Sequence, residues 1–374
     1  MLSIWERNSF IQYDHIIVGG GIVGLCTAFY LKEKFPDHTV MILERGLLPS
    51  GASTKNAGFA CMGSLTEILD DLHHSTEEEV LELFLLRKRG LERLQQLLGA
   101  ENMGYRTNGS YELLFEKELP ALERIDAINL LLQKELKHNA FTRKDEKIAE
   151  FGFAKQQVKA LIENTCEGEI DTGLMMKNLI KKVSQAGIEI KSGCEVLAFA
   201  EQKNSIDIIC KNPVGGEIIF KAKKLFICNN AFARTLLPDV DVSPGRGQVL
   251  ITKPIEGLKF KGIFHFDKGY YYFREYKGCV LFGGGRNLDF ENETSTAFSL
   301  NQKIQADLIE KLSSVILPGQ APEIDLQWSG IMAFGKTKRP IVKQLSEKIF
   351  VAVRMGGMGV AIGSEVGFQL GEMA

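Results

Sequence analysis

Residues 14–31 read DHIIVGGGIVGLCTAFYL, a stretch that is almost wholly apolar after His15 apart from its glycines. Residues 16–18 form a β-branched run suited to a buried strand, three glycines interrupt it, and residues 25–31 have a helical pattern. A membrane-spanning helix needs about 20 apolar residues. This stretch is shorter and runs directly into the charged residues 32–34, so it predicts a strand, a tight turn and a helix.

The spacing of the glycines indicates a nucleotide-binding turn. Gly19, Gly21 and Gly24 fit G-x-G-x-x-G, in which the glycines allow a sharp turn, a close approach to a pyrophosphate and tight helix–strand packing. A second strand, VMILE, ends at Glu44, 20 residues after Gly24, where a carboxylate can accept hydrogen bonds from both ribose hydroxyls. An acid at this position favours NAD or FAD over NADP, and the choice between these two stays open at this point.

Length and composition restrict the class of protein. A chain of 374 residues is long enough for two domains, and a net charge of -2 with 25% charged residues gives no sign of nucleic-acid or anionic-membrane binding. The seven cysteines form no CxxC pair and no metal-type cluster with histidine, as expected for buried thiols in a reducing compartment. The spacing of the cysteines and histidines therefore predicts no bound metal. Glu6 and Arg7 lie where a signal peptide would have its apolar stretch, so we expect a cytoplasmic protein. We also expect no transmembrane segment.

Two further glycine-containing segments could contact a ligand. The loop GASTKNAG, residues 51–58, follows the second strand and is rich in small and polar residues. By itself it fits a surface loop and a ligand-binding loop equally well. Near the end of the chain, residues 351–353 complete a buried strand, glycines allow a turn, and a helix starts near Val360. The amino terminus of that helix would direct partial positive charge at a bound group.

These segments together resemble the D-amino acid, glycine and sarcosine oxidase family of FAD-dependent oxidoreductases. The resemblance rests on IIVGGGIVGL with Glu44-Arg45, on GASTKNAG, and on IFVAVRMGGMGVAIGSEVG at 349–367. It implies non-covalently bound FAD, with adenine contacted by the backbone at Cys194-Glu195-Val196. Many relatives carry a glycine–alanine pair where this chain has Asn229-Asn230-Ala231. The implied cofactor contacts are Gly19, Gly21, Ile22, Val23, Gly24, Glu44, Arg45, Ser53, Lys55, Asn56, Ala57, Gly58, Val196, Asn229, Gly356, Gly357, Met358, Gly359 and Val360.

The expected fold is α/β, with a Rossmann-like FAD-binding domain and an interwoven, largely antiparallel β substrate domain. Helical patterns cover 66–99, 118–136 and 171–187, and short strands follow to residue 228, including EIIFKA and KLFIC as separate strands. Residues 244–290 alternate like antiparallel strands. We assign 1–65, 150–240 and 330–374 to the FAD-binding domain, and 66–149 and 241–329 to the substrate domain.

Candidate substrate contacts lie in the cluster Tyr270-Tyr271-Tyr272-Phe273-Arg274. In relatives the corresponding strand provides an aromatic hydroxyl, which Tyr271 or Tyr272 would match, and Arg274 is a third candidate. The arginine that binds a substrate carboxylate in several relatives is replaced by Met332. A lysine that assists oxygen reduction in the sarcosine oxidase branch would fall near Leu281 and is absent. The possible substitutes for the missing arginine are Lys336, Lys338, Arg339 and Arg354.

The expected reaction is oxidation of a C–N bond in an amino acid or related amine, by hydride transfer from the α-carbon to flavin N5, giving an imine. This step needs orientation more than a strong base, and His265 is more typical of a packed side chain than of a base. The electron acceptor could be oxygen or a quinone-like or dye-like compound. Two alternatives remain: an FAD-dependent 2-hydroxy acid dehydrogenase, which the opening strand–helix–strand unit also resembles, and a non-catalytic flavin-binding protein.

Overall fold

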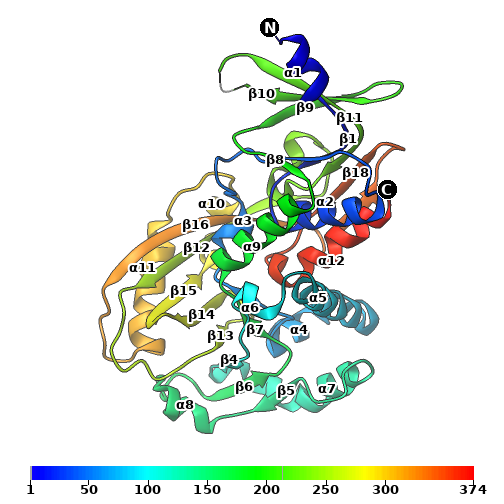
Figure 1. Ribbon diagram of the computed structural model, residues 1–374. Helices are drawn as coiled ribbons and strands as arrows, with labels where there is room; N and C mark the ends of the chain where they lie inside the picture. Colours follow the sequence, from blue (N-terminus) through cyan, green and yellow to red (C-terminus); the bar gives the residue numbers. More distant parts are fainter. Residues whose placement is uncertain (1, 213) are drawn as a thin grey trace.

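The computed structural model describes residues 2–212 and 214–374, and in this part of the chain two eight-stranded sheets dominate (Figure 1). The first sheet has the core order β17-β18-β11-β1-β2-β8, with β10 paired to β11 and β9 to β10. Its strands are β1 Gln12–Val18, β2 Val40–Leu43, β8 Glu189–Lys191, β9 Val196–Glu201, β10 Ile206–Lys211, β11 Glu217–Ile227, β17 Ile341–Gln344 and β18 Ile349–Val353.

The centre of the first sheet is parallel, as the Rossmann-like prediction requires. Val18 at the end of β1 pairs with Leu43 of β2 and Ile227 of β11, so three carboxyl ends meet at one edge. All four residues of β2 are buried because both faces of the sheet are covered. Helices pack on one face, and residues 231–242 and 331–333 pack on the other. The helix α2, Ile22–Lys34, begins four residues after Val18 and therefore starts at this edge.

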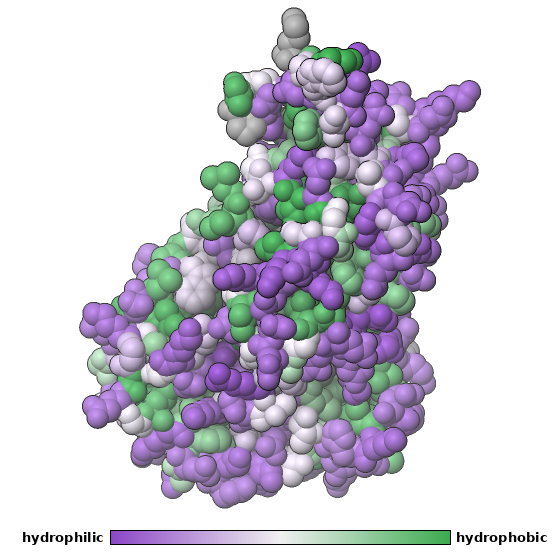
Figure 2. Space-filling model, in the orientation of Figure 1, coloured by the Kyte–Doolittle hydropathy of each residue, from purple (hydrophilic) through white to green (hydrophobic). Residues whose placement is uncertain are grey.

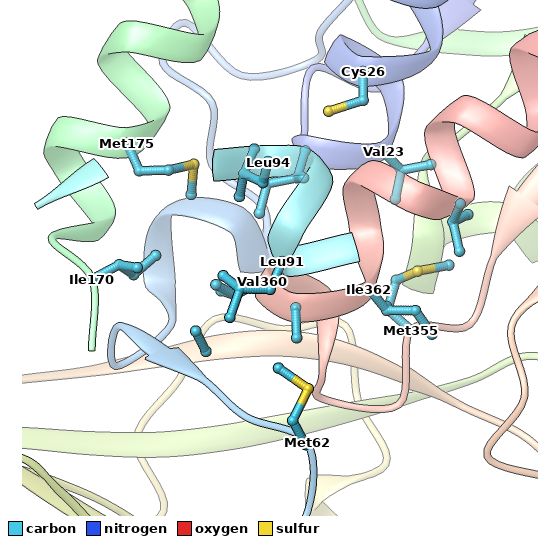
Figure 3. Close-up of a cluster of buried hydrophobic side chains, with 14 of the residues drawn as sticks. Val23, Cys26, Met62, Leu91, Leu94, Ile170, Met175, Met355, Val360 and Ile362 are labelled. Atoms are coloured by element: carbon cyan, nitrogen blue, oxygen red, sulfur yellow. The ribbon is translucent and has the colours of Figure 1, made fainter. Parts of the chain in front are cut away.

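Closely packed helices lie on one face of the first sheet. The helix α2 and the C-terminal α12 (Gly359–Glu372) contact its strands, α9 (Thr172–Gln185) packs on α2, and α5 (Glu77–Leu98) packs on α12. Figure 3 shows Cys26 of α2, Leu91 of α5 and Val360 of α12 directed into one apolar cluster. A Cβ at Gly367 would lie 2.7 Å from Cys26 Cβ, so only glycine permits this approach of α12 to α2.

The second sheet has the order β16-β12-β15-β14-β13-β4-β6-β5 and is antiparallel except for the parallel pair β13–β4. This confirms the antiparallel pattern expected for 244–290. Its strands are β4 Ser110–Leu114, β5 Phe141–Arg143, β6 Ala160–Asn164, β12 Ser243–Thr252, β13 Ile263–Phe266, β14 Tyr271–Tyr276, β15 Cys279–Gly284 and β16 Ile324–Phe334. A small third sheet joins β3 (Phe59–Ala60) to β7 (Gly168–Glu169).

Two local predictions were wrong. EIIFKA and KLFIC form one strand, β11. The side chains of Lys221 and Lys223 both point outward, in step with the alternation of the strand, so the pairing continues through them. The helical pattern over 118–136 divides into a 3-10 helix, Glu116–Arg124, and α7, Ile125–Gln133, because Pro120 cannot donate a backbone hydrogen bond. The other helices are α1 Ile4–Ser9, α3 Ala52–Lys55, α4 Leu65–Asp71, α6 Ala100–Met103, α8 Glu146–Phe151, α10 Phe290–Glu293 and α11 Gln302–Lys311.

The division into sheets differs in part from the domain limits expected from the sequence. The strand β6 lies within 150–240 but pairs with β4 in the second sheet, and β16 continues past residue 330. The chain thus crosses between the sheets more often than the sequence suggests, and the exact domain limits stay a prediction.

The face of the molecule that is seen in the orientation of Figure 1 is mostly polar. Figure 2 shows a largely hydrophilic face with apolar side chains in separate groups. No helix among residues 2–212 and 214–374 is long and apolar enough to cross a membrane.

A buried acid in β4 makes stability depend on pH. Burial raises the pKa of Glu112 from 4.5 to about 7, although its carboxylate accepts hydrogen bonds from Ser64 Oγ (2.8 Å) and the Thr66 backbone N–H (3.1 Å). Because the folded-state pKa is raised, the contribution of Glu112 is fully present below pH 4.5 and is lost as the pH rises through about 7.

We therefore expect the free energy of unfolding of Glu112→Gln, relative to that of the unchanged protein, to increase by at most ~3 kcal/mol when the pH is raised from 5 to 8. Urea unfolding at both pH values measures this difference. Glu123→Gln changes an exposed carboxylate and is the matched control. Equal stability differences at both pH values would show that Glu112 does not titrate in this range.

Candidate active site

A cavity of about 490 Å³ lies at the carboxyl edge of the first sheet and is lined by residues of both large sheets. Val18, Leu43 and Cys228 line it from the ends of β1, β2 and β11, whereas Tyr272 and Met332 line it from β14 and β16. Its volume is in the usual range of ligand pockets. The first glycine turn and the C-terminal glycine turn thus meet at one cavity.

The first turn, at residues 19–24, forms an anion site. A Cβ at Gly24 would lie 2.0 Å from the Gly19 carbonyl oxygen, and Gly19 has φ +110°, so both positions require glycine. Gly21 caps α2 without a side-chain hydrogen bond, and Ile22 N–H donates to Ser53 Oγ (3.0 Å). The other N–H groups of the first turn of α2 are open to an anionic ligand at the cavity.

Glu44 is buried at the cavity wall and holds the glycine turn in place. Its Oε2 accepts a hydrogen bond from Gly20 N–H (2.9 Å), and its Oε1 accepts one from Gly46 N–H (2.9 Å). A carboxylate has further lone pairs, so these bonds leave acceptor capacity for a ribose. The carboxylate is therefore suited to two tasks: binding the nucleotide, as the sequence predicts, and shaping the turn, which the sequence does not reveal.

We expect Glu44→Ala to fold but to bind FAD about 10- to 100-fold more weakly, because it loses charge-assisted hydrogen bonds and leaves two turn N–H groups unpaired. Titration of FAD into protein stripped of cofactor measures the dissociation constant. Glu33→Gln, an exposed change on α2, is the control. Unchanged FAD affinity in Glu44→Ala would disprove the role of this carboxylate.

The second turn presents another open helix terminus. Gly356 and Gly357 have φ +57° and +83°, and Met358 caps α12 without a side-chain hydrogen bond. Arg354 also has a left-handed backbone, φ +72°, which Asn230 supports by accepting Arg354 N–H through Oδ1 at 3.0 Å. The start of α12 lines the same cavity as the start of α2, so the positive ends of two helices serve one ligand.

The residues around the cavity fit FAD. Asn229 lines it, and its Oδ1 is buried without a hydrogen-bond partner among the described residues, so a bound donor would satisfy it. Arg45 lies over the Phe232 ring, 3.6 Å from the centroid, where an adenine-sized group could pack. The two helix termini would carry the charge of the pyrophosphate and the flavin.

The loop 51–58 is fixed between the two sheets. Asn56 Oδ1 accepts hydrogen bonds from Gly58 N–H (2.9 Å) and Thr172 Oγ1 (2.8 Å). Trp328 of β16 donates from Nε1 to the Lys55 carbonyl oxygen (3.0 Å). Residues of this loop line the cavity, and its contact with the cofactor stays a prediction.

Most of the expected cofactor contacts line the cavity, and two do not. Gly24 packs against the Gly19 carbonyl oxygen, and Gly58 lies behind the wall, where its own carbonyl oxygen accepts from Arg274. The residues that do line it are Gly19, Gly21, Ile22, Val23, Glu44, Arg45, Ser53, Lys55, Asn56, Ala57, Val196, Asn229, Gly356, Gly357, Met358, Gly359 and Val360.

Among the expected substrate contacts only Tyr272 faces the cavity. Tyr271 points to the opposite face of β14, packs among phenylalanines and donates its hydroxyl to Asp307 Oδ2 (2.8 Å). Arg274 shares the face of Tyr272 but donates to the carbonyl oxygens of Gly58 (2.8 Å) and Ile170 (2.7 Å). Tyr271 and Arg274 therefore do not agree with the expected contacts, because strand alternation turns one away and the loop covers the other. Burial raises the pKa of Tyr272 to about 12.

His265 is a packed side chain, as the sequence suggests, and it lies beside two other buried polar groups. It lines the cavity on β13, with Nε2 3.5 Å from Glu167 Oε2 and 3.8 Å from Cys61 Sγ. Burial acts to lower the pKa of His265, but the hydrogen bond and charge of Glu167 outweigh it, and the net pKa is raised. These three groups could hold a metal ion by distance. The sequence therefore did not reveal that these three side chains lie together. Glu167 also accepts hydrogen bonds from Met62 N–H (2.6 Å), Gly63 N–H (2.9 Å) and Ser110 Oγ, which tie the cluster to the cavity wall.

The cations that the sequence offers near Met332 are engaged elsewhere. Lys338 pairs with Glu67 (3.5 Å) and Asp71 (2.5 Å), and Arg339 pairs with Glu82. Arg354 pairs with Asp241 and donates to the Arg339 carbonyl oxygen. Lys336 is exposed and does not line the cavity, whereas Met332 does.

Sequence reasoning missed several wall residues, notably Phe59, Arg286 and Phe334. Phe59 packs edge-on to His265 (5.3 Å between ring centroids) and to Tyr272 (5.5 Å). These residues come from separate strands and carry no motif. Only the glycine run just before Arg286 could have directed attention to it.

The combination of nucleotide-binding turn, second helix terminus and enclosed aromatic wall defines a flavin-dependent oxidoreductase. Residues 14–373 match the model of the family described as FAD dependent oxidoreductase, and the chain belongs to this family. The cofactor is FAD, as expected from the sequence.

The chain is similar to proteins of several activities. It is 24% identical over 341 residues to sarcosine oxidase subunit beta of Rhizobium meliloti, an alignment that covers 88% of this chain and 76% of that protein. It is 23% identical over 253 residues to L-2-hydroxyglutarate dehydrogenase of Escherichia coli K12, covering 67% of this chain but only 54% of that protein. Glycine oxidase from Geobacillus kaustophilus has the same fold, with TM-score 0.78, 19% identity, and coverage of 97% and 95% of the two chains.

Proposed function

We propose that this protein oxidises the C–N bond of an amino acid or a related amine. The single observation that supports this is the shared cavity, in which two helix termini for FAD face a wall of Tyr272, Phe59 and His265. When bound, FAD would supply the acceptor of two electrons. The substrate loses a hydride from its α-carbon and a proton from nitrogen, and a C=N bond forms. Water later hydrolyses the imine to a carbonyl compound and ammonia, or an amine where the nitrogen carries a substituent.

The wall residues orient the substrate and exclude water. The rings of Phe59 and Tyr272 and the thioether of Met332 give the substrate side an apolar surface, and the Tyr272 hydroxyl offers a polar contact within it. A neutral amine needs no strong base before it gives up hydride, so this arrangement is sufficient for the proposed reaction.

A second candidate is oxidation of a 2-hydroxy acid, which the similarity to L-2-hydroxyglutarate dehydrogenase favours. An alcohol must give its hydroxyl proton to a base. His265 lines the cavity, but its Nε2 lies 3.5 Å from Glu167 Oε2, within the buried cluster on the wall. A neutral amine needs no such base, and the alignment to the dehydrogenase covers only 54% of that protein. We therefore prefer amine oxidation.

Anaerobic mixing of the yellow protein with amines, amino acids and 2-hydroxy acids tests these functions. We expect amino acids or amines to bleach the visible flavin band. Bleaching only by hydroxy acids would establish the second candidate, and no bleaching by any compound would favour a non-catalytic flavin-binding protein.

We also propose that oxygen is a poor electron acceptor, because apolar Leu281 packs with Ala57 and Val249 where oxidases of the sarcosine branch carry a lysine. Reoxidation of the reduced protein by air and by a quinone, followed at the same wavelength, compares the two acceptors.

The cellular compartment belongs to the same proposal. We propose a cytoplasmic protein, which the seven free cysteines support. Fractionation of the producing cells tests this location.

A further inference from the structure

We propose that Arg286 binds a carboxylate of the substrate, so that the substrate is an amino acid rather than a simple amine. This inference rests on the proposed function and adds the substrate class to it. Arg286 follows β15 and begins the 3-10 turn η3, Arg286–Leu288, on the cavity wall that also holds Tyr272 and Met332.

The backbone around Arg286 makes room for its side chain. Gly285 has φ +73°, which turns the chain at the end of β15. On the neighbouring strand β12, a Cβ at Gly245 would lie 3.0 Å from Arg286 Cζ and 2.3 Å from the Phe334 ring. The guanidinium lies over Phe334, 4.2 Å from the ring centroid, and is 5.0 Å from the centroid of Phe290. This stacking holds the plane of the guanidinium while its N–H groups stay free for a planar anion.

The acid whose charge acts on Arg286, Glu293, already forms an ion pair with Arg246. Its Nε is buried without a hydrogen-bond partner, and no ion pair joins its guanidinium to another described residue. Burial lowers the pKa of Arg286, but an arginine stays charged in proteins. A half-buried, unpaired cation is unfavourable, and a carboxylate in the cavity would satisfy both its charge and its hydrogen-bond donors.

The other cations at the cavity are less suited to this task. Lys338 and Lys268 form ion pairs with acids of α4, at 2.5 Å to Asp71 and 2.6 Å to Asp70. Lys55 has no ion pair within residues 2–212 and 214–374 and lies over the Phe298 ring at 5.2 Å, but it stands on the loop that flanks the expected flavin position.

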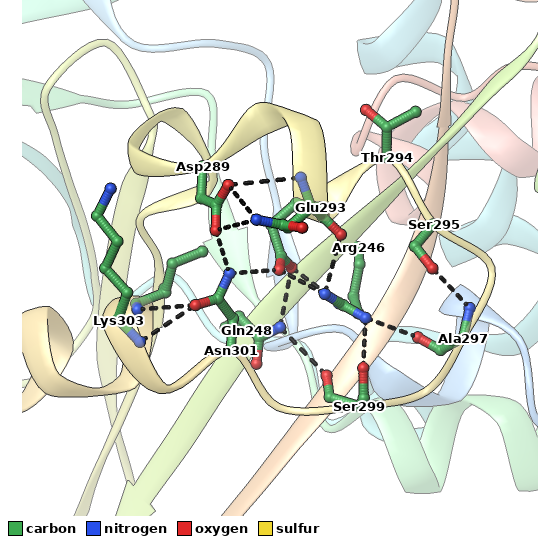
Figure 4. A network of polar contacts seen from close by, with 12 residues as sticks. Arg246, Gln248, Asp289, Glu293, Thr294, Ser295, Ala297, Ser299, Asn301 and Lys303 are labelled. Carbon is green, nitrogen blue, oxygen red and sulfur yellow. Dashed lines mark hydrogen bonds and ion pairs between the residues drawn. The ribbon is translucent and has the colours of Figure 1, made fainter.

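The segment that follows Arg286 is held rigidly. Figure 4 shows Arg246 of β12 bonded to Glu293, with Ser299 and Asn301 completing a network over the loop after η3. Arg246 donates from Nε to Glu293 Oε2 (3.0 Å) and from Nη2 to Glu293 Oε1 (2.6 Å). The network fixes the loop on β12, the strand that also carries Gly245, so Arg286 is held in position before a ligand binds.

Matched pairs of compounds test the proposal in the FAD-containing protein. Glycine and methylamine, alanine and ethylamine, and phenylalanine and phenethylamine differ by one carboxylate. For Arg286→Met we expect the concentration for half-maximal flavin reduction to rise about 10- to 100-fold for the amino acid of a reactive pair and to stay within twofold for its amine. Arg286→Lys keeps the charge but not the planar donors, and should lose less.

A binding measurement separates this proposal from the proposed function. Acetate, propionate and phenylacetate are titrated into the oxidised protein, and the shift of the flavin band is followed without turnover. We expect a carboxylate to perturb the spectrum of the unchanged protein and of Lys268→Met, which removes another cation at the cavity, and to bind about 10-fold or more weakly to Arg286→Met. Carboxylate binding without turnover would reject only the proposed function. Absence of carboxylate binding, equal binding to Arg286→Met, or an equal loss in Lys268→Met would overturn the role of Arg286.

Discussion

The variant Gly21→Val is expected to fold but to purify without yellow colour, with FAD bound at least about 100-fold more weakly. Gly21 caps α2 at the cavity, and even a Cβ at this position would lie 2.9 Å from Ser53 Oγ. The two methyl groups of valine would displace Ser53 and occupy the path of the pyrophosphate to the helix amino terminus. A 100-fold loss corresponds to about 2.7 kcal/mol of binding free energy, which loss of the phosphate contacts can account for.

Absorbance of the purified protein and calorimetric titration with FAD measure this effect. Gly173→Ala on α9 is a suitable control, because its new Cβ would meet only Asp171, at 3.5 Å. Far-UV circular dichroism establishes whether the valine variant folds. A folded Gly21→Val protein that stays fully yellow would show that FAD does not pass over this turn.

The variant Arg246→Met should lose ~3–5 kcal/mol of unfolding free energy, the largest stability change that we expect from one side chain. Glu293 is fully buried and accepts two hydrogen bonds from the Arg246 guanidinium. Methionine keeps much of the volume but leaves the carboxylate without its counter-charge, and Gln248 and Asn301 supply only neutral donors. The loop that follows Arg286 would then lose its attachment to β12.

The pH dependence distinguishes this mechanism from a simple packing defect. Burial acts to raise the pKa of Glu293, but Arg246, Gln248 and Asn301 outweigh it and the net pKa is lowered. In the unchanged protein the stabilisation is thus present above the ordinary pKa of 4.5 and lost as the pH falls. Without Arg246 the pKa should rise, so the defect of Arg246→Met should become smaller at pH 5 than at pH 8. Urea unfolding measures both values.

The double variant Arg246→Met/Glu293→Gln provides the matched comparison. Glutamine keeps the acceptor and removes the uncompensated charge, so this variant should recover more than half of the lost free energy at pH 8. A double variant as unstable as Arg246→Met at every pH would show that the lost packing, and not the buried charge, causes the defect.

The sequence predicts the glycine turn and the acid beside it because their determinants are local. Gly19 and Gly24 must turn one strand into one helix within six residues, and Glu44 ends the adjacent strand, so spacing alone carries their relation. The same holds for Gly357 and the start of α12. The spacing of apolar residues predicted the ends of helices and strands less well. Pro120 divides the helix expected over 118–136, and β11 is one strand where the sequence suggested two.

The substrate half depends on contacts that no spacing records. Alternation along β14 places Tyr271 and Tyr272 on opposite faces, but only packing against the second sheet's core decides that Tyr272 is the one that faces the cavity. Arg274 lies two residues after Tyr272, on the same face of β14, so the alternation alone would predict that it also reaches the cavity. The loop around Gly58 covers it instead.

By itself, then, the amino-acid sequence determined a Rossmann-like nucleotide turn, its acidic partner and the family's FAD, because each arises within a short span whose backbone geometry is set by glycine and strand patterns. Only the tertiary structure decided the chemistry of the opposite wall. It joined His265 to Glu167, paired three of the four expected cations with acids, and left Arg286 stacked on Phe334 without an ion-pair partner among the described residues. These outcomes depend on how distant strands pack, since burial and pairing are properties of neighbours in space.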